Sequence, residues 1–446
     1  MGAGGNLGPI FLGLKEIVLS GIKKHQQGDV NGALKVYDAV LGRVITEPYV
    51  LHCVGTVFVD MQLFGIAAQI LMRCIETSPH HADWIPETYM NLGVALRNEA
   101  HEEEAKACYR RFLELRPNDP IGWANLSGVY INYGDPEKAI LYADKALSID
   151  PKNRQARHHR ALALLEMEKY EAGFKQYEAR LELPEFHRRN YDGPMWDGKK
   201  VGTLVIHGEQ GLGDEVMFCS LIPRVKELAE RAVVECNHKL ITLFERSFGV
   251  KCYPSEEEIK KNEKGDAWIP MGSLPRVMGI KAPIQHSGFL KPPASKFKGE
   301  GFRIGLSWRG GTKKTHENLR NFDCGEWKKL IDPDFKWVSV QYGNCKAERE
   351  ELGLIDPEWS GDMDEFAALI DSCDHIITIC NTTVHFAGAL NKPCWVLVPN
   401  KPAWRYGTVS DRMLFYPSVK MYRQGKEESW GSVIERVKTD LQRLKS

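Results

Sequence analysis

The chain has 446 residues, enough for two to four domains at about 100 to 200 residues each. Hydrophobic residues make up 43% of it and charged residues 26%, which excludes a wholly disordered or fibrous protein. Lys and Arg together number 59, as do Asp and Glu together, so the net charge is zero and does not support binding to nucleic acid or anionic lipid.

No apolar run approaches the ~20 residues that a membrane-spanning helix needs, and the glycine-rich N-terminus carries no export or anchor signal. The eleven cysteines are scattered from Cys53 to Cys394 without a C-x-x-C pair, which is typical of reduced, buried thiols. We therefore expect a cytoplasmic protein with no membrane span, no disulfide framework and no metal site.

A 34-residue period runs through the N-terminal part. With Pro86 as position 1, the small and bulky residues of 86–119 fall where a tetratricopeptide repeat places them, and the next 34 residues repeat the pattern in register. Weaker copies occupy residues 14–47, 48–81 and 154–187. The spacing predicts an α-solenoid of about five helix pairs over 14–187. Such an array binds a protein or other macromolecular partner, or serves as a spacer or dimerisation element.

The pattern changes after a polar segment, 188–200, which contains Gly193, Pro194 and Gly198 and is predicted to be a linker. Beyond it, short β-rich runs alternate with helical periods in two series, 201–295 and 300–446, which predicts two α/β units. We expect strands at 203–207, 233–236, 250–253, 267–269, 303–307, 336–341, 375–380 and 394–398. Helices are expected at 214–230, 326–331, 364–372, 383–390 and 430–446. The fold class is thus α + α/β.

The first candidate motif is the glycine loop 207–214, which follows an expected strand and ends in Asp214. Glycines such as Gly211 and Gly213 let the backbone approach a ligand closely. The alternative is that Asp214 only caps the helix that follows, because Asp is a preferred N-cap residue.

The second motif, 378–388, takes a strand directly into a helix. Free backbone amides, Asn381, Thr382, Thr383 and His385 together favour a diphosphate at the positive end of that helix. The alternatives are simple capping by the polar side chains and a buried structural role for His385.

The third motif, 307–320, is a basic loop after another strand, with Lys314 and Arg320 among its four cations. These cations are suited to phosphates, although a solvated basic loop is the alternative. Asp362 and Asp364 resemble a metal-binding D-x-D, but they directly precede a helical run, so capping is the predicted role and no metal is assigned.

The three motifs, in this order after the repeats, resemble bacterial and phage proteins that fuse such repeats to a glycosyltransferase domain similar to the ADP-heptose heptosyltransferases of glycosyltransferase family 9. The architecture is also similar to the O-linked N-acetylglucosamine transferases. The residues that carry the resemblance are 208–215, 305–308, 338–341, 385–390 and 404–406.

The resemblance implies a GT-B fold, in which the C-terminal Rossmann-like half, 300–446, binds a nucleoside-diphosphate sugar without metal and the N-terminal half, 201–295, receives the acceptor. It implies Asp214 as the general base. It assigns donor binding to Gly211, Gly213, Ser307, Trp308, Lys314, Arg320, Gln341, Asn381, Thr382, Thr383 and His385. Cys380 and Asn381 replace the usual Asp-Thr pair, and the N-terminal half is short. A non-enzymatic adaptor with a degenerate nucleotide-binding module is therefore the alternative.

Overall fold

The computed structural model describes residues 48–79, 81–132, 134–209, 211–282, 288–297, 299–311, 317–408, 410–413 and 415–445, with isolated positions between 16 and 39. The chain divides into two compact units, Met1–Ala156 and Arg157–Ser446. None of the helices in these ranges combines the length and the apolar character that crossing a bilayer requires.

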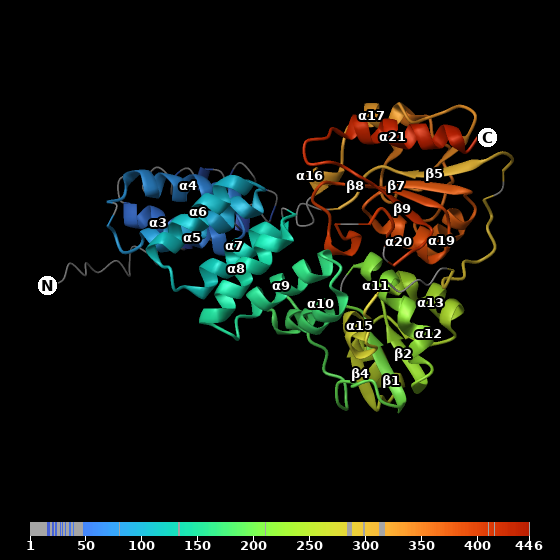
Figure 1. Ribbon diagram of the computed structural model, residues 1–446, viewed down its shortest axis with the longest axis horizontal. Coiled ribbons are helices and arrows are strands. Elements are labelled where there is room, and N and C mark those ends of the chain that lie inside the picture. Colours follow the sequence, from blue (N-terminus) through green and yellow to red (C-terminus); the bar gives the residue numbers. More distant parts are fainter. Residues whose placement is uncertain are drawn as a thin grey trace. The chain divides into compact units, whose positions relative to one another are not determined.

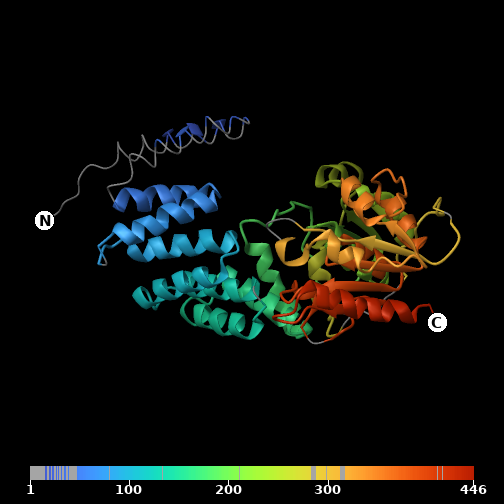
Figure 2. The same ribbon diagram turned by 90° about the horizontal axis from the view of Figure 1, so that it is seen from above.

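Helix pairs make up the first unit from Pro48 onward (Figure 2). They are α3 (Pro48–Asp60) with α4 (Phe64–Thr77), α5 (Ile85–Asn98) with α6 (Glu102–Leu115), and α7 (Pro120–Asn132) with α8 (Pro136–Ile149). The pairs cross at small residues, as the repeat pattern predicts. A Cβ added to Gly93 would lie 2.7 Å from Cε1 of Tyr109, so the crossing has no room for a larger residue. The predicted copy at 14–47 lies mostly outside the described residues.

The second unit begins with α9 (Arg154–Glu166), whose first turn spans the boundary between the units, α10 (Tyr170–Tyr177) and the 3₁₀ turn η1 (Glu178–Glu182). Two parallel sheets follow (Figure 1). The first has the order β3-β2-β1-β4, formed by β1 (Val201–His207), β2 (Ala229–Glu235), β3 (Lys251–Tyr253) and β4 (Ala267–Pro270). The second has the order β6-β5-β7-β8-β9, formed by β5 (Arg303–Ser307), β6 (Lys336–Ser339), β7 (His375–Ile379), β8 (Cys394–Val398) and β9 (Val419–Arg423).

Helices accompany both sheets. Around the first are α11 (Leu212–Phe218), α12 (Ile222–Val225), α13 (Ile241–Phe248), α14 (Glu256–Asn262) and α15 (Leu274–Val277). Around the second are α16 (Glu317–Arg320), α17 (Cys324–Lys328), α18 (Lys346–Leu352), α19 (Met363–Asp371), α20 (Thr382–Ala389) and α21 (Trp430–Arg443).

The second sheet is buried on both faces, because its strands alternate between two cores. Ile376 of β7 packs in the core that contains α19 and α20, whereas its neighbour Ile377 packs in the core that contains α17 and α21. Figure 1 shows these helix pairs on opposite sides of the sheet. This is why the strands read as continuous apolar runs in the sequence.

The secondary structure differs from the sequence-based expectations in two places. The single helix expected at 214–230 is wrong: α11 is followed by the 3₁₀ turn η2 (Cys219–Leu221) and by α12, where Pro223 lacks the amide that a continuous helix needs, and β2 already begins at Ala229. Strand β9 was not expected. Within the predicted linker, 188–200, Trp196 is buried and its amide donates to the Trp268 carbonyl at 2.8 Å, so this part of the segment packs against the first sheet.

Candidate functional site

Asp214 is the third residue of α11 and does not cap this helix, since the N-cap position belongs to Gly211. Its carboxylate forms an ion pair with the guanidinium of Arg405, which lies in the 3₁₀ turn η6 (Trp404–Tyr406) after β8. The two side chains are 17% and 19% exposed. The capping alternative for Asp214 is therefore wrong, and the carboxylate is held at the point where η6 meets the glycine loop.

The start of α11 packs directly on α20 of the second sheet. A Cβ added to Gly213 would lie 2.8 Å from Cδ2 of His385, so the two helices meet this closely only because residue 213 is glycine. The contact brings the Asp214 loop and the 381–385 turn together, although the sequence separates them by about 170 residues.

Asn381 caps α20. Its Oδ1 accepts hydrogen bonds from the Thr383 amide at 2.9 Å and from Thr378 Oγ1 at 3.0 Å, while its Nδ2 donates to Ser307 Oγ at 2.8 Å. The capping alternative is confirmed for Asn381, and the Thr383 amide is already occupied. The Thr382 amide, at the first helical position, has no hydrogen-bond partner among the described residues, so it is free to meet an anion.

Gln341 and Ser307 stabilise the loop after β5 from inside. The Gln341 Oε1 accepts from Ser307 Oγ at 3.1 Å and from the amides of Trp308 and Arg309 at 3.0 Å each. Ser307, Trp308 and Gln341 are all buried. They hold the predicted donor loop in place, and a direct contact between these three side chains and a donor stays a prediction.

Three arginines lie near enough to the end of β7 to act electrostatically on Cys380. Arg320 donates to the Cys380 carbonyl at 2.7 Å. Burial raises the pKa of the Cys380 thiol to about 11, while the positive charges of Arg320, Arg423 and Arg405 act in the opposite direction. The strand end that precedes the Thr382 amide is therefore electropositive. Lys314, the other predicted cation, lies outside the described residues.

His385 is 4% exposed, and its Nδ1 lies 3.1 Å from the Tyr416 hydroxyl. Burial lowers the pKa of His385 to about 3, and the nearby charge of Arg405 lowers it further in the same direction. The imidazole is neutral at pH 7, so it offers no charge to a diphosphate. The side chain is buried, as the structural alternative weighed from the sequence predicts, and a contact between His385 and a donor stays a prediction.

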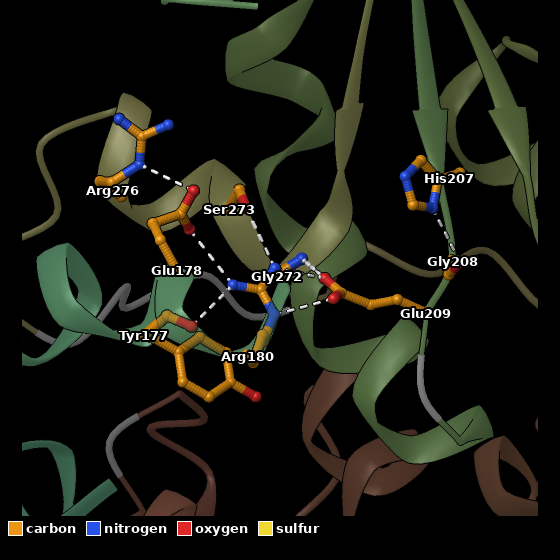
Figure 3. A network of polar contacts seen from close by, with 9 residues as sticks. All are labelled: Tyr177, Glu178, Arg180, His207, Gly208, Glu209, Gly272, Ser273 and Arg276. Carbon is orange, nitrogen blue, oxygen red and sulfur yellow. Dashed lines mark hydrogen bonds and ion pairs between the residues drawn. The ribbon is translucent and has the colours of Figure 1, made fainter. Parts of the chain in front are cut away.

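The glycine loop is also fixed from the side of α10, by Arg180 of η1 (Figure 3). The Arg180 guanidinium makes two hydrogen bonds to Glu209, at 2.8 and 2.7 Å, and a third to Ser273 Oγ at 3.0 Å. Glu209 also accepts from the Gly272 amide at 2.6 Å. Arg180 and Glu209 are only 5% and 3% exposed, so this ion pair is a rigid link between the last helix pair and the loop that carries Asp214.

Sequence reasoning did not assign roles to Arg405, Tyr416 or Arg180. Arg405 lies in one of the segments that carry the resemblance, but nothing in that segment indicates that its partner is 191 residues away. The D-x-D segment was interpreted correctly as a cap, because Asp362 accepts from the amides of Asp364 and Glu365.

Comparison with known proteins identifies the repeats. The tetratricopeptide repeat family matches residues 86–119 and 122–153. These segments are tetratricopeptide repeats. Protein FlbA of Caulobacter vibrioides is 26% identical over 509 residues, covering 96% of this chain and 84% of FlbA, so the likeness includes the α/β region. The peroxisomal targeting signal receptor of Kluyveromyces lactis is 27% identical over 128 residues, which is 28% of this chain and 22% of the receptor.

Two similar solved structures each cover little more than a third of this chain. The crystal structure of MamA is 25% identical and covers 36% of this chain and 92% of its own, with a TM-score of 0.30. The structure of YrrB, described as a TPR protein with an unusual peptide-binding site, is 16% identical. The match covers 37% of this chain and 84% of YrrB, with a TM-score of 0.29. The family match and the sheet topology together make the chain a tetratricopeptide-repeat solenoid followed by a parallel-sheet α/β region.

Proposed function

We propose that the α/β region is a GT-B glycosyltransferase that moves a sugar from a nucleoside-diphosphate sugar to an acceptor. The observation that carries this proposal is the direct packing of α11 on α20. It brings the helix that carries Asp214 against the helix that begins with the free Thr382 amide, directly after the electropositive end of β7. Transfer between two substrates needs these groups to be adjacent, because the base acts on the acceptor while the anion site holds the donor.

In the proposed reaction, Asp214 takes the proton of the acceptor hydroxyl, amine or amide as that atom forms a bond to the anomeric carbon. The bond from this carbon to the diphosphate oxygen breaks, and the nucleoside diphosphate leaves with the electron pair. The Thr382 amide and Arg320 stabilise its charge together with Lys314, which the sequence assigns to the same loop. Arg405 holds the Asp214 carboxylate in place until the acceptor arrives, and no step in the proposal calls for a metal.

The tetratricopeptide repeats are proposed to recruit the acceptor as part of a protein or another macromolecule. The curved surface of stacked helix pairs is the usual binding face of such arrays. The non-enzymatic alternative keeps this role for the repeats and leaves the α/β region without turnover.

The proposal is tested by screening nucleoside-diphosphate sugars for thermal stabilisation of the full chain, then measuring sugar transfer and donor hydrolysis with those that bind. We expect Asp214→Asn to keep nucleotide affinity within a few-fold and to lose turnover, whereas the exposed control Asp192→Asn keeps both. Near-native turnover of Asp214→Asn would remove the residue from the mechanism. If no nucleotide sugar stabilised the protein, the adaptor function would be favoured.

A further inference from the structure

A polar pocket of about 220 Å³ lies at the carboxyl ends of β1, β2 and β3. It is lined by residues between His187 and Pro254, so the first sheet and the segment before it form the pocket without any residue of the second sheet. Carboxylates dominate its polar lining, with Glu209, Glu215 and Glu235 facing a single arginine, Arg189.

Two of these three carboxylates are already neutralised. Glu235 forms an ion pair with Arg189 at 2.6 Å and accepts a hydrogen bond from the Tyr191 hydroxyl. Glu209 is held by the buried Arg180 at 2.7 Å. Neither group has charge left for a ligand.

Glu215 is different. It is 7% exposed, and its Oε2 accepts a hydrogen bond from the Asn237 amide at 2.9 Å. Its Oε1 accepts from no residue in the described part of the chain, and no cation pairs with it there. A Cβ added to Gly208 would lie 2.7 Å from this Oε1, so a glycine at the pocket wall leaves room for the oxygen. The pocket therefore holds a buried carboxylate with an open acceptor position.

The burial of Glu215 has an electrostatic cost. Desolvation raises its pKa to about 7, the charges of Glu235 and Asp214 add to this, and the Asn237 amide and Arg189 oppose it. The other titratable groups of the pocket and its wall are Glu209, His187, Cys219 and Cys236. A positive group bound beside Glu215 would offset this cost, whereas a neutral hydroxyl would leave the carboxylate charge uncompensated.

We propose that this pocket binds one primary ammonium group, carried on a small molecule or at the end of a short aliphatic chain. The volume is below the roughly 300 to 1,000 Å³ of pockets for drug-sized ligands, so it fits a head group with a few carbons. A metal cation fits less well, because no three His, Cys, Asp or Glu side chains among the described residues are placed so that they could hold a metal ion. The inference goes beyond the proposed transferase, since the pocket needs neither the donor site nor a repeat partner.

The test uses n-butylamine as the probe and 1-butanol as its neutral counterpart, with binding to the full chain measured by ligand-observed NMR titration. We expect butylamine to bind and butanol not to bind at pH 8. Because the ammonium needs an ionised carboxylate and Glu215 titrates near pH 7, affinity should rise about tenfold from pH 6 to pH 8. Butylamine itself stays protonated over this range.

Glu215→Gln should abolish butylamine binding and its pH dependence, since the amide still accepts from Asn237 but carries no charge. The matched control is Glu230→Gln, an exposed carboxyl on β2, which should leave both unchanged. Failure of butylamine to bind the unmodified protein at pH 8, equal binding of butanol, or unchanged affinity in folded Glu215→Gln would each overturn the proposal. If Glu215→Gln does not fold, the pH dependence of butylamine binding to the unmodified protein is the test. An affinity that does not change between pH 6 and pH 8 would then reject the proposal. The transferase assay uses a different readout, so either proposal can fail alone.

Discussion

The carboxylate of Asp214 and the guanidinium of Arg405 form an ion pair that joins the first turn of α11 to η6. Both groups are largely shielded from water, and the Nε of Arg405 is buried without a partner among the described residues. Arg405 also lies over the Trp404 ring, with its guanidinium carbon 5.7 Å from the ring centroid. We therefore expect this ion pair to stabilise the folded protein and to hold Asp214, the proposed base, in position.

Removing both members of the pair should cost less than the sum of the costs of removing each one alone. Arg405→Met leaves the Asp214 carboxylate shielded without a cation, and we expect a loss of about 2 kcal/mol in the free energy of unfolding. The double variant Asp214→Asn/Arg405→Met should lose less than the sum of the single changes, with a coupling of about 1 to 2 kcal/mol. Urea unfolding checks this, with the exposed Arg412→Met as control. Strict additivity would mean that the pair contributes nothing.

The Thr382 amide can be removed without altering the helix. Proline is tolerated at the first helical position, and Asn381 before it is already extended, at φ −146° and ψ −171°. We expect Thr382→Pro to fold normally and to bind a nucleoside diphosphate about 10- to 100-fold more weakly, because it loses one hydrogen bond to a charged group. Thr382→Ala is the matched control and should lose only about fivefold. Calorimetry that found equal affinity in the two variants would place the diphosphate elsewhere.

His385 should make stability depend on pH. Its pKa is lowered to about 3, below the ordinary value of 6.5, so the stability it contributes is complete above pH 6.5 and is lost as the pH falls toward 3. The loss is about 1.4 kcal/mol per pH unit. Relative to His385→Gln, the unmodified protein should lose about 2 kcal/mol between pH 6.5 and pH 5 in chemical unfolding. The exposed control His238→Gln should keep the original slope. Parallel curves for the protein and His385→Gln would contradict this assignment.

Arg180 should stabilise the glycine loop. Arg180→Leu leaves Glu209 buried without its cation, and we expect about 3 kcal/mol of destabilisation. Arg180→Lys should restore only part of it, because an ammonium cannot make the two parallel hydrogen bonds of the guanidinium. Arg188→Leu, at an exposed position nearby, serves as control and should change stability by less than about 0.5 kcal/mol. A lysine variant as stable as the original would show that bidentate geometry is unimportant.

The crossing of α5 and α6 at Gly93 should not tolerate a larger side chain at this position. Gly93→Ala places a methyl against the Tyr109 ring, and the overpacking should outweigh the gain in helix propensity, for a net loss of about 1 kcal/mol. Gly65→Ala is the matched control, since its methyl would come no nearer than 3.8 Å to the Glu99 side chain and should be neutral or stabilising. Thermal unfolding followed by circular dichroism ranks the two variants. A Gly93→Ala protein that melted above the original would reject the packing argument.

Much of the fold could be predicted from the sequence, because local patterns record local packing. The repeat spacing located Gly93 at a helix crossing, and continuous apolar runs located β5, β7 and β8 almost to the residue. The helix expected at 214–230 was too long because its apolar spacing continues past Pro223, where the backbone cannot. Strand β9 could not be predicted in the same way, because charged residues interrupt its apolar pattern.

The candidate site was predictable only in part. Asp214 stands out at the end of a glycine loop, and the 381–385 turn stands out because its polar residues directly follow a strand. Arg405, the partner of Asp214, does not stand out in the sequence, because the pairing depends on how η6 packs. The raised pKa of Glu215 and the lowered pKa of His385 also depend on burial among residues distant in sequence, which no short motif records.

The position of the boundary at Ala156, rather than at the end of the last helix pair, determines how the protein can be recombined. Phe174 and Tyr177 of α10 contact Trp404, and Arg180 anchors Glu209, so α10 and η1 form part of the scaffold of the α/β region. We therefore expect that repeats upstream of Ala156 can be exchanged for those of another array while these contacts are kept. A chimaeric protein joined at residue 187 would lose the contacts of α10 and η1. The exchangeable part of the chain therefore ends before α10.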